Sequence, residues 1–374
     1  MDNTKESILQ SIDTATLTPI VRKALNRDHI QLRDWHMKQL GGGMGNPVSV
    51  GLYRFEGTGQ DGNEEVAWSV VLKILQSPLN VGWLNMGEGD DQTHWNYWKR
   101  ELFVYQSGWL DALPEGLTAP HCYGTVELPG NYALLWLEDI RDSLDGDWTL
   151  DRYVLTARHL GRLSGMAPMP THPWFSLHRN RQWLALISWQ DFPWDHPLTL
   201  RRYPRRENNP FWRMLTENER FLSKLSKLPQ TPYHGDSYPT NFMSRRLANG
   251  QEQTVALDWA LMGISSLGDD LGQFTFGAHT NLKGLSPSDI TDALFKSYLA
   301  GLRDVGFQFD PQLARFGFVA SAALRIGLFQ VYLLGESIKQ DDADGTVDHA
   351  GDTTVPDCFE VTMATEAYRL LESI

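Results

Sequence analysis

The segment HGDSYPTN at residues 234–241, followed by LDW at 257–259, constrains the fold of this chain more than any other stretch. Residues 241–243 and 254–257 are mostly apolar and typical of two short strands joined in a hairpin. Such a hairpin would bring Asp258 back beside Asn241 and Asp236. Three oxygen-bearing side chains would then converge, and such ligands suit a hard cation such as Mg²⁺ that carries a phosphate.

Length and charge limit the class of protein. With 374 residues the chain is expected to form two domains or lobes, and 41% apolar residues suffice for a large core. A net charge of −13 argues against a nucleic-acid partner, which would bind a basic face. The same charge is compatible with a cationic substrate, although an acidic protein without such a substrate would also carry it.

Three observations favour a cytoplasmic protein without a membrane partner. The N-terminal residues contain neither the basic nor the apolar segment of a signal peptide. The two cysteines, Cys122 and Cys358, form neither a disulfide framework nor a metal-binding spacing. Residues 316–335 are almost all apolar but include three polar residues, Arg325 among them, so we expect a buried helix of a helical lobe.

The N-terminal part has the pattern of a small sheet. Five runs are typical of strands, at residues 30–40, 48–55, 66–75, 120–128 and 132–137. Lys73 lies inside the apolar run of the third strand. An unpaired ammonium is costly to bury, so Lys73 needs a carboxylate or phosphate partner unless it extends from a sheet edge into solvent. Glu101, within the helically spaced segment 91–110, is the candidate partner.

A glycine-rich turn, GGGMGN at residues 41–46, lies between the first two predicted strands. Its glycines permit positive φ angles and a close approach of backbone to a ligand, which makes Gly43 and Gly45 candidates for nucleotide contacts. A plain hairpin loop explains the same glycines equally well.

The C-terminal part has helical spacing in most of its length. Helices are predicted at residues 150–165, 211–228, 287–305, 311–337 and 357–373. The stretch from 168 to 212 is rich in Trp, whose faces could hold a cation or a sugar ring, although Trp is more often part of a core. The fold class is therefore α+β, with a five-stranded antiparallel N-terminal lobe carrying one helix and a larger, mainly helical C-terminal lobe.

The order of these parts resembles the aminoglycoside phosphotransferase and choline kinase family, the small-molecule relatives of protein kinases. The residues that carry the resemblance are Lys73, Glu101, HGDSYPTN at 234–241, LDW at 257–259 and GDDL at 268–271. It spans about residues 35–335 and implies a protein-kinase-like fold of two lobes. Residues 1–138, with a helical extension at the start, would form the nucleotide-binding lobe, and residues 139–374 the catalytic and substrate-binding lobe.

The resemblance implies where a nucleotide would lie. ATP, or GTP in its place, would bind with Mg²⁺ between the lobes, and the adenine of ATP would meet the hinge backbone near Trp136 and Leu137. Lys73 would hold the α- and β-phosphates, and Glu101 would orient Lys73.

The resemblance also assigns roles within the HGDSYPTN region. Asn241 and Asp258 would bind Mg²⁺ through oxygen. Asp236 would be the catalytic residue that accepts the hydrogen bond of the substrate hydroxyl and aims it at the γ-phosphorus. His234 would support the catalytic loop rather than shuttle protons. Asp270, with its neighbour Asp269, would anchor the backbone of that loop or cap the helix that follows.

The predicted function is ATP-dependent transfer of the γ-phosphate to a hydroxyl of a small molecule, an amino sugar or amino alcohol before others, by a monomer or dimer. One alternative is a non-catalytic nucleotide-binding module of the same fold, although the full set of site residues is present. The other is a metal-dependent hydrolase that uses His234, Asp236 and Asp258. A hydrolase would need further His or carboxylate ligands nearby and would give the Lys73–Glu101 pair no purpose.

Overall fold

The computed structural model describes residues 3–41, 46, 48–81, 91–166, 171–203, 208–344 and 358–374. Gly43 and Gly45, the predicted nucleotide contacts of the glycine-rich turn, lie outside these residues. Two helices open the chain, α1 (Asn3–Gln10) and α2 (Thr14–Leu25). Asp13 caps α2 by accepting a hydrogen bond from the Thr16 backbone at 2.8 Å, and Pro19 lies inside α2.

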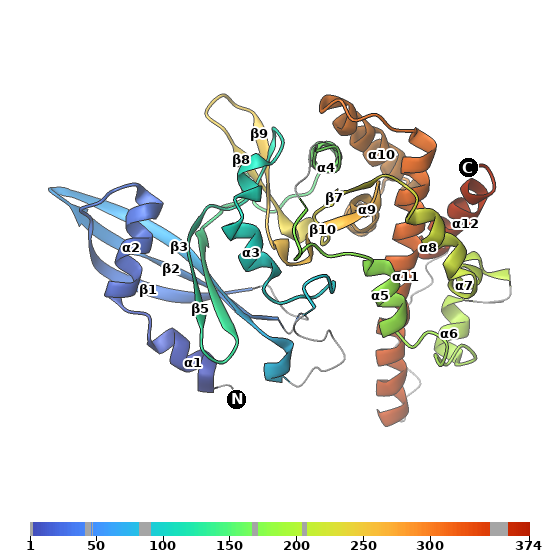
Figure 1. Ribbon diagram of the computed structural model, residues 1–374, viewed down its shortest axis with the longest axis horizontal. Coiled ribbons are helices and arrows are strands. Elements are labelled where there is room, and N and C mark those ends of the chain that lie inside the picture. Colours follow the sequence, from blue (N-terminus) through green and yellow to red (C-terminus); the bar gives the residue numbers. More distant parts are fainter. Residues whose placement is uncertain are drawn as a thin grey trace.

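An antiparallel five-stranded sheet follows, with strand order β1-β2-β3-β6-β5. Its strands are β1 (Gln31–Leu40), β2 (Ser49–Asp61), β3 (Glu64–Gln76), β5 (Cys122–Leu128) and β6 (Tyr132–Glu138). Every neighbouring pair in this sheet is antiparallel, which confirms the predicted fold class for the N-terminal part. Figure 1 shows the sheet on one side of the molecule, with α2 beside it and the helical part on the other side.

The segment between β3 and β5 differs from the predicted helix at 91–110. Helix α3 covers only Arg100–Gln106, and residues 91–99 form turns before it. The physical reason is the Arg100 side chain, whose guanidinium donates hydrogen bonds to the carbonyl oxygens of Gln92, His94 and Trp95 at 2.5–3.0 Å. Those carbonyl groups point at a side chain instead of along a helix axis.

The C-terminal part is mainly helical, as predicted (Figure 1). Its helices are α4 (Leu150–Ser164), α5 (Arg179–Leu186), α6 (Pro197–Arg202), α7 (Pro210–Thr216), α8 (Asn218–Leu225), α9 (Asp269–Asn281), α10 (Pro287–Asp304), α11 (Pro311–Asp344) and α12 (Phe359–Leu371). Two small sheets lie among them. One pairs β7 (Gln230–Tyr233) with β10 (Gly263–Ser266), and the other has the order β4 (Leu117–Thr118), β9 (Glu252–Ala256), β8 (Phe242–Arg246).

Helix α11 contains the long apolar run. Among the described residues it is the one helix long and apolar enough to cross a membrane, yet 72% of its most apolar window is buried inside the protein. It packs against α5, α7, α9 and α12. The prediction of a buried helix in the helical lobe is therefore confirmed.

The sheet separates two hydrophobic cores. Along β6, Leu134 and Trp136 face the core that the sheet forms with α2, while Leu135 and Leu137 face the other. This second core includes Leu102 of α3 and continues into the helical part. Because successive strand residues alternate between faces, Lys73 of β3 points to the side of α3. The division of the chain between residues 138 and 139 stays a prediction.

Candidate active site

The predicted hairpin is present and brings the two ends of the site together. Strands β8 and β9 pair with Phe242 opposite Ala256, and the Leu257 backbone donates to the Asn241 carbonyl at 2.8 Å. Asn241 and Asp258 therefore flank the base of the hairpin. Asp258 adopts a left-handed backbone conformation, with φ 56°, at the start of the short helix η5 (Trp259–Leu261).

Asn241 and Asp236 contact each other directly. The Asn241 amide nitrogen donates to the backbone carbonyl of Asp236 and to its Oδ2, each at 2.8 Å. Because the nitrogen makes both bonds, the amide oxygen is the atom left for a cation. Asp236 and Asn241 are therefore in contact, and Asp258 follows the strand that pairs with the one after Asn241.

Lys73 joins the sheet to this hairpin. Its Nζ lies 2.5 Å from Glu101 Oε2 and 2.9 Å from Asp258 Oδ1, and the Lys73 and Glu101 residues are only 3% and 1% exposed. The predicted Lys73–Glu101 pair is present. Burial disfavours the ammonium, but the Asp258 and Glu101 carboxylates outweigh it and hold the pKa of Lys73 above its ordinary value.

His234 and Asp270 hold the loop that carries Asp236. The Asp270 carboxylate accepts hydrogen bonds from the backbone nitrogens of His234 at 2.6 Å and of Gly235 at 3.0 Å. His234 Nε2 lies 2.8 Å from the Leu257 carbonyl, so it carries the proton, while Nδ1 accepts from the Asp236 backbone at 3.2 Å. Both ring nitrogens bind backbone, which is the arrangement of a supporting residue.

A second carboxylate at the start of α9 binds an arginine. Asp269 Oδ1 lies 2.6 Å from Arg179 Nη2, and Arg179 Nη1 donates to the Gly235 carbonyl at 2.5 Å. Both side chains are 1% exposed. Asp269 therefore acts on the loop through Arg179, whereas Asp270 holds the backbone of the loop itself.

The sequence did not predict the partners that surround Asp236. Two helices each supply one partner to the same oxygen, Asp236 Oδ1. Gln273 of α9 donates to it from Nε2 at 2.8 Å, and Nη2 of Arg325, which belongs to α11, lies 3.3 Å from it. Arg325 is 7% exposed. A signal for Arg325 existed, because a charged residue inside a long apolar run needs a buried partner.

Arg100 is the other residue that sequence reasoning missed. Besides the three carbonyl groups before α3, it donates to the carbonyl oxygens of Trp174 at 2.7 Å and Ala260 at 2.9 Å. Ala260 belongs to η5, which directly follows Asp258. Arg100 thus fixes the helix that bears Glu101 against the turn that bears Asp258, and both are partners of Lys73.

The predicted hinge residues lie inside the sheet. Trp136 and Leu137 pair with β3 on one side and β5 on the other, and they are 1% and 6% exposed. Strand β6 ends at Glu138, so the first residues beyond the ladder are 139–140. A contact of Trp136 and Leu137 with adenine stays a prediction.

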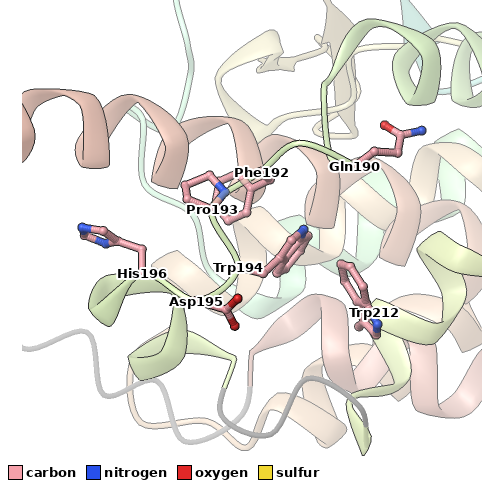
Figure 2. A pocket seen from close by; sticks show the side chains of 7 residues that line it. All are labelled: Gln190, Phe192, Pro193, Trp194, Asp195, His196 and Trp212. Atoms are coloured by element: carbon pink, nitrogen blue, oxygen red, sulfur yellow. The ribbon is translucent and has the colours of Figure 1, made fainter.

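The Trp-rich segment packs into the helical core. Trp174, Trp189 and Trp194 are each at most 8% exposed, and the Trp194 and Trp212 rings meet edge to face at 4.5 Å. Figure 2 shows these two rings side by side at a hollow of about 490 Å³. None of the site residues above lines this hollow. Trp174, Trp189 and Trp194 are therefore core residues.

The described residues favour no transition-metal site. Among them there is no group of three or more His, Cys, Asp or Glu side chains placed to share a metal ion. The two oxygen-bearing side chains at the hairpin, Asn241 and Asp258, instead suit a hard cation that takes its remaining ligands from phosphate and water.

No family model and no curated protein matches the chain. Solved structures of small-molecule kinases are similar to it over nearly its whole length.

Three of these structures illustrate the similarity. Amicoumacin kinase hAmiN, in complex with AMP-PNP, Ca²⁺ and Ami, is 15% identical, with 99% of this chain and 96% of that chain covered and a TM-score of 0.48. Choline kinase LicA from Streptococcus pneumoniae is 12% identical, with 99% of both chains covered and a TM-score of 0.48. Wild-type aminoglycoside 2'-phosphotransferase-IIIa, as its GDP complex, is 15% identical, with 97% and 98% covered and a TM-score of 0.47.

Proposed function

We propose that this protein is a kinase that transfers the γ-phosphate of ATP to a hydroxyl group of a small molecule. The observation that carries the proposal is the position of Lys73, 2.5 Å from Glu101 and 2.9 Å from Asp258. A buried lysine of the sheet meets a carboxylate at the hairpin that also carries Asn241, next to Asp236. Positive charge for phosphates and oxygen ligands for their cation are thereby adjacent.

The nucleotide site would use residues from both parts of the chain. Lys73 would bind the phosphates of ATP, with GTP as a second possible donor, and Glu101 would keep the Lys73 ammonium in place. Asn241 and Asp258 would hold Mg²⁺, which when bound neutralises charge on the phosphate oxygens. A cation ligand of this kind must be an ionised carboxylate, and the surroundings of Asp258 favour that form. Burial favours its neutral form, but Lys73 holds the pKa of Asp258 below its ordinary value.

Asp236 would orient and deprotonate the acceptor. The acceptor oxygen attacks the γ-phosphorus, the bond from that phosphorus to the β–γ bridging oxygen breaks, and ADP leaves with the electron pair. The hydroxyl proton passes to Asp236 and then to solvent. Asn241 and Gln273 bind different oxygens of the Asp236 carboxylate at 2.8 Å each, and this fixes its direction. In phosphoryl transfer such positioning supplies most of the catalysis.

The acceptor class is less constrained than the reaction. The net charge of −13 favours an amine-bearing acceptor, an amino sugar or amino alcohol, through long-range attraction. The net charge says little about the groups next to the reacting hydroxyl, however. There Arg325 places a positive charge 3.3 Å from Asp236. An amine remote from that hydroxyl is compatible with both observations. ATP and Mg²⁺ are abundant in the cytoplasm, which is the location we propose.

A screen of hydroxylated small molecules by coupled ADP release, with ATP and Mg²⁺, tests the proposal. With an active acceptor, Asp236→Asn should lower kcat by about 10²–10⁴-fold, because a positioned base contributes that much. The variant should bind MgATP as the wild type does. Asp28→Asn, at an exposed position before the sheet, is the matched control and should keep full activity.

Two results would contradict the proposal. Near-wild-type turnover in Asp236→Asn would remove Asp236 from the catalytic role. MgATP binding without turnover on any acceptor would favour the non-catalytic nucleotide-binding module.

A further inference from the structure

Arg325 has hydrogen-bonding capacity that the protein does not use. Its Nη2 makes one long contact, 3.3 Å to Asp236 Oδ1. Its Nη1 is buried and finds no hydrogen-bond partner among the described residues. A buried guanidinium N–H without a partner is costly, so an oxygen of a bound molecule would stabilise it.

At this position the guanidinium of Arg325 has an unused donor, whereas both oxygens of the Asp236 carboxylate already accept hydrogen bonds. Burial, and then the nearby Arg179 guanidinium, lower the pKa of Arg325 to about 10. Arg179 is committed to Asp269 and to the Gly235 carbonyl, whereas Arg325 shares the carboxylate of Asp236 with Gln273. An ammonium beside the reacting hydroxyl would lie close to the Arg325 guanidinium and could not use its free N–H. A carboxylate there would instead match the fork of N–H donors of Arg325.

An exposed aromatic strip begins one helical turn from Arg325. Phe329 and Tyr332 follow it on α11 and are 39% and 48% exposed, and they are the exposed aromatic side chains in the described part of the chain. Residues spaced by three or four share one face of a helix, so both lie on the face of Arg325. At 1.5 Å per residue they stand about 6 and 10 Å from Arg325 along the axis. In Figure 1 the C-terminal part of α11 extends past α5.

We propose that Arg325, Phe329 and Tyr332 form the acceptor-binding surface, and that it selects a hydroxylated carboxylic acid with an apolar ring. The acceptor carboxylate would bind Arg325 close to the reacting hydroxyl, and the ring would lie on Phe329 and Tyr332. This assignment rests on the phosphotransferase function proposed above, and an amine of the acceptor would lie remote from both the carboxylate and the reacting hydroxyl. It follows from continuity, because the strip leads directly to a residue that touches Asp236.

Matched acceptors test the charge preference. Three series of ring-bearing alcohols would differ only in the group beside the hydroxyl: a carboxylate, a neutral amide or an ammonium. In the wild type, kcat/KM should fall in that order, by about tenfold or more from carboxylate to ammonium. In Arg325→Gln the ratio of kcat/KM for the carboxylate series to kcat/KM for the ammonium series should fall to about one. Arg325→Lys should keep the order of the three series, because it keeps the charge. MgATP affinity and the melting temperature, measured for each variant, report on binding of the nucleotide and on folding.

Alanine variants test the aromatic strip separately. Phe329→Ala and Tyr332→Ala should each raise KM for the ring-bearing acid by about tenfold and leave KM for a small acid without a ring unchanged. Leu200→Ala on α6 removes an equally exposed apolar side chain, 43% exposed, and should change neither.

Two outcomes separate this proposal from the one it rests on. An equal or greater kcat/KM for the ammonium series, or an Arg325→Gln variant that slows all three series by the same factor, overturns the acceptor surface and leaves the kinase assignment intact. Absence of both MgATP binding and ADP release with every acceptor overturns the kinase assignment, and the acceptor surface with it.

Discussion

Lys73 contacts both Glu101 and Asp258, and variants at this residue distinguish its effect on stability from its effect on nucleotide binding. Lys73→Met leaves Glu101 buried and unpaired, so we expect a loss of about 3–5 kcal/mol in the free energy of unfolding together with loss of MgATP binding. The double variant Lys73→Met, Glu101→Gln removes the buried charge as well. It should recover most of the stability and none of the nucleotide affinity. Urea unfolding and calorimetric titration with MgATP measure the two effects.

The contrary result at Lys73 is equally specific. If Lys73→Met binds MgATP with wild-type affinity, Lys73 is a structural ion-pair partner of Glu101 and Asp258 and contacts no phosphate. The nucleotide would then have to find its positive charge elsewhere in the site.

Among the buried charged residues, some could be predicted from the sequence and others could not. Lys73 is conspicuous in the sequence because its neighbours are apolar, and its two carboxylate partners are present. Arg325 carries the same signal within residues 316–335, but its partner is set by how α11 crosses the loop of Asp236. Arg100 and Arg179 have polar neighbours in the sequence, and the bonds that tie them to the site go to backbone carbonyls distant in sequence, those of Trp174, Ala260 and Gly235. No pattern in the sequence indicates such bonds.

At the scale of single elements, the turn at Gly235 fixes the direction of Asp236. Gly235 has φ +84°, and a Cβ there would lie 2.1 Å from the Leu261 carbonyl oxygen. Gly235→Ala should therefore displace the loop and lower kcat by about 10²-fold or more, since a misplacement of about 1 Å can cost that much. Steady-state kinetics with an active acceptor measure the loss.

Gly250 offers the matched control for this turn. It has φ +82° in the β8–β9 connection, and a Cβ there would meet nothing within 4 Å. Gly250→Ala should cost about 1 kcal/mol of stability through backbone strain alone and leave kcat unchanged. An equal loss of kcat in both variants would mean that the Gly235 turn has no particular role in placing Asp236.

Helices and strands could be predicted from the sequence where their apolar residues recur with one clear spacing. The five strands of the sheet, α4 and α10 follow alternation or helical spacing, and the β8–β9 hairpin follows two short apolar runs. Residues 91–99 also have helical spacing, yet Arg100 holds their carbonyl groups in turns. The short strands β7 and β10 pair across 30 residues or more of chain, and their four residues each are too few to show a period.

At the scale of the whole molecule, one core links the sheet to the helical part. It runs from Leu135 and Leu137 of β6 through Leu102 of α3 to α4, α9 and α11, so Lys73, Glu101 and Asp258 are held by a common packing unit. The core that the sheet forms with α2 is built from residues of the N-terminal part alone. The site therefore depends on the stability of the large core.

His159 should make that stability depend on pH. The ring is 3% exposed on α4, and its Nδ1 lies 2.8 Å from Thr254 Oγ1 of β9. Burial, followed by the charges of Arg162 and Arg158, lowers the pKa of His159 from 6.5 to about 4. The unfolded chain therefore binds a proton more readily than the folded one, so the contribution is complete above about pH 6.5 and is lost as pH falls toward 4.

Between about pH 7.5 and about pH 5 this single group should reduce the free energy of unfolding by about 2 kcal/mol. His159→Gln should show a pH dependence smaller by that amount, because Gln does not titrate. His29, which is exposed in the turn before β1, gives the control His29→Gln, which should keep the wild-type slope. Urea unfolding at the two pH values measures all three proteins. Identical slopes for the wild type and His159→Gln would show that His159 takes up its proton equally well in the folded protein, and the core beside β9 would then tolerate the charge.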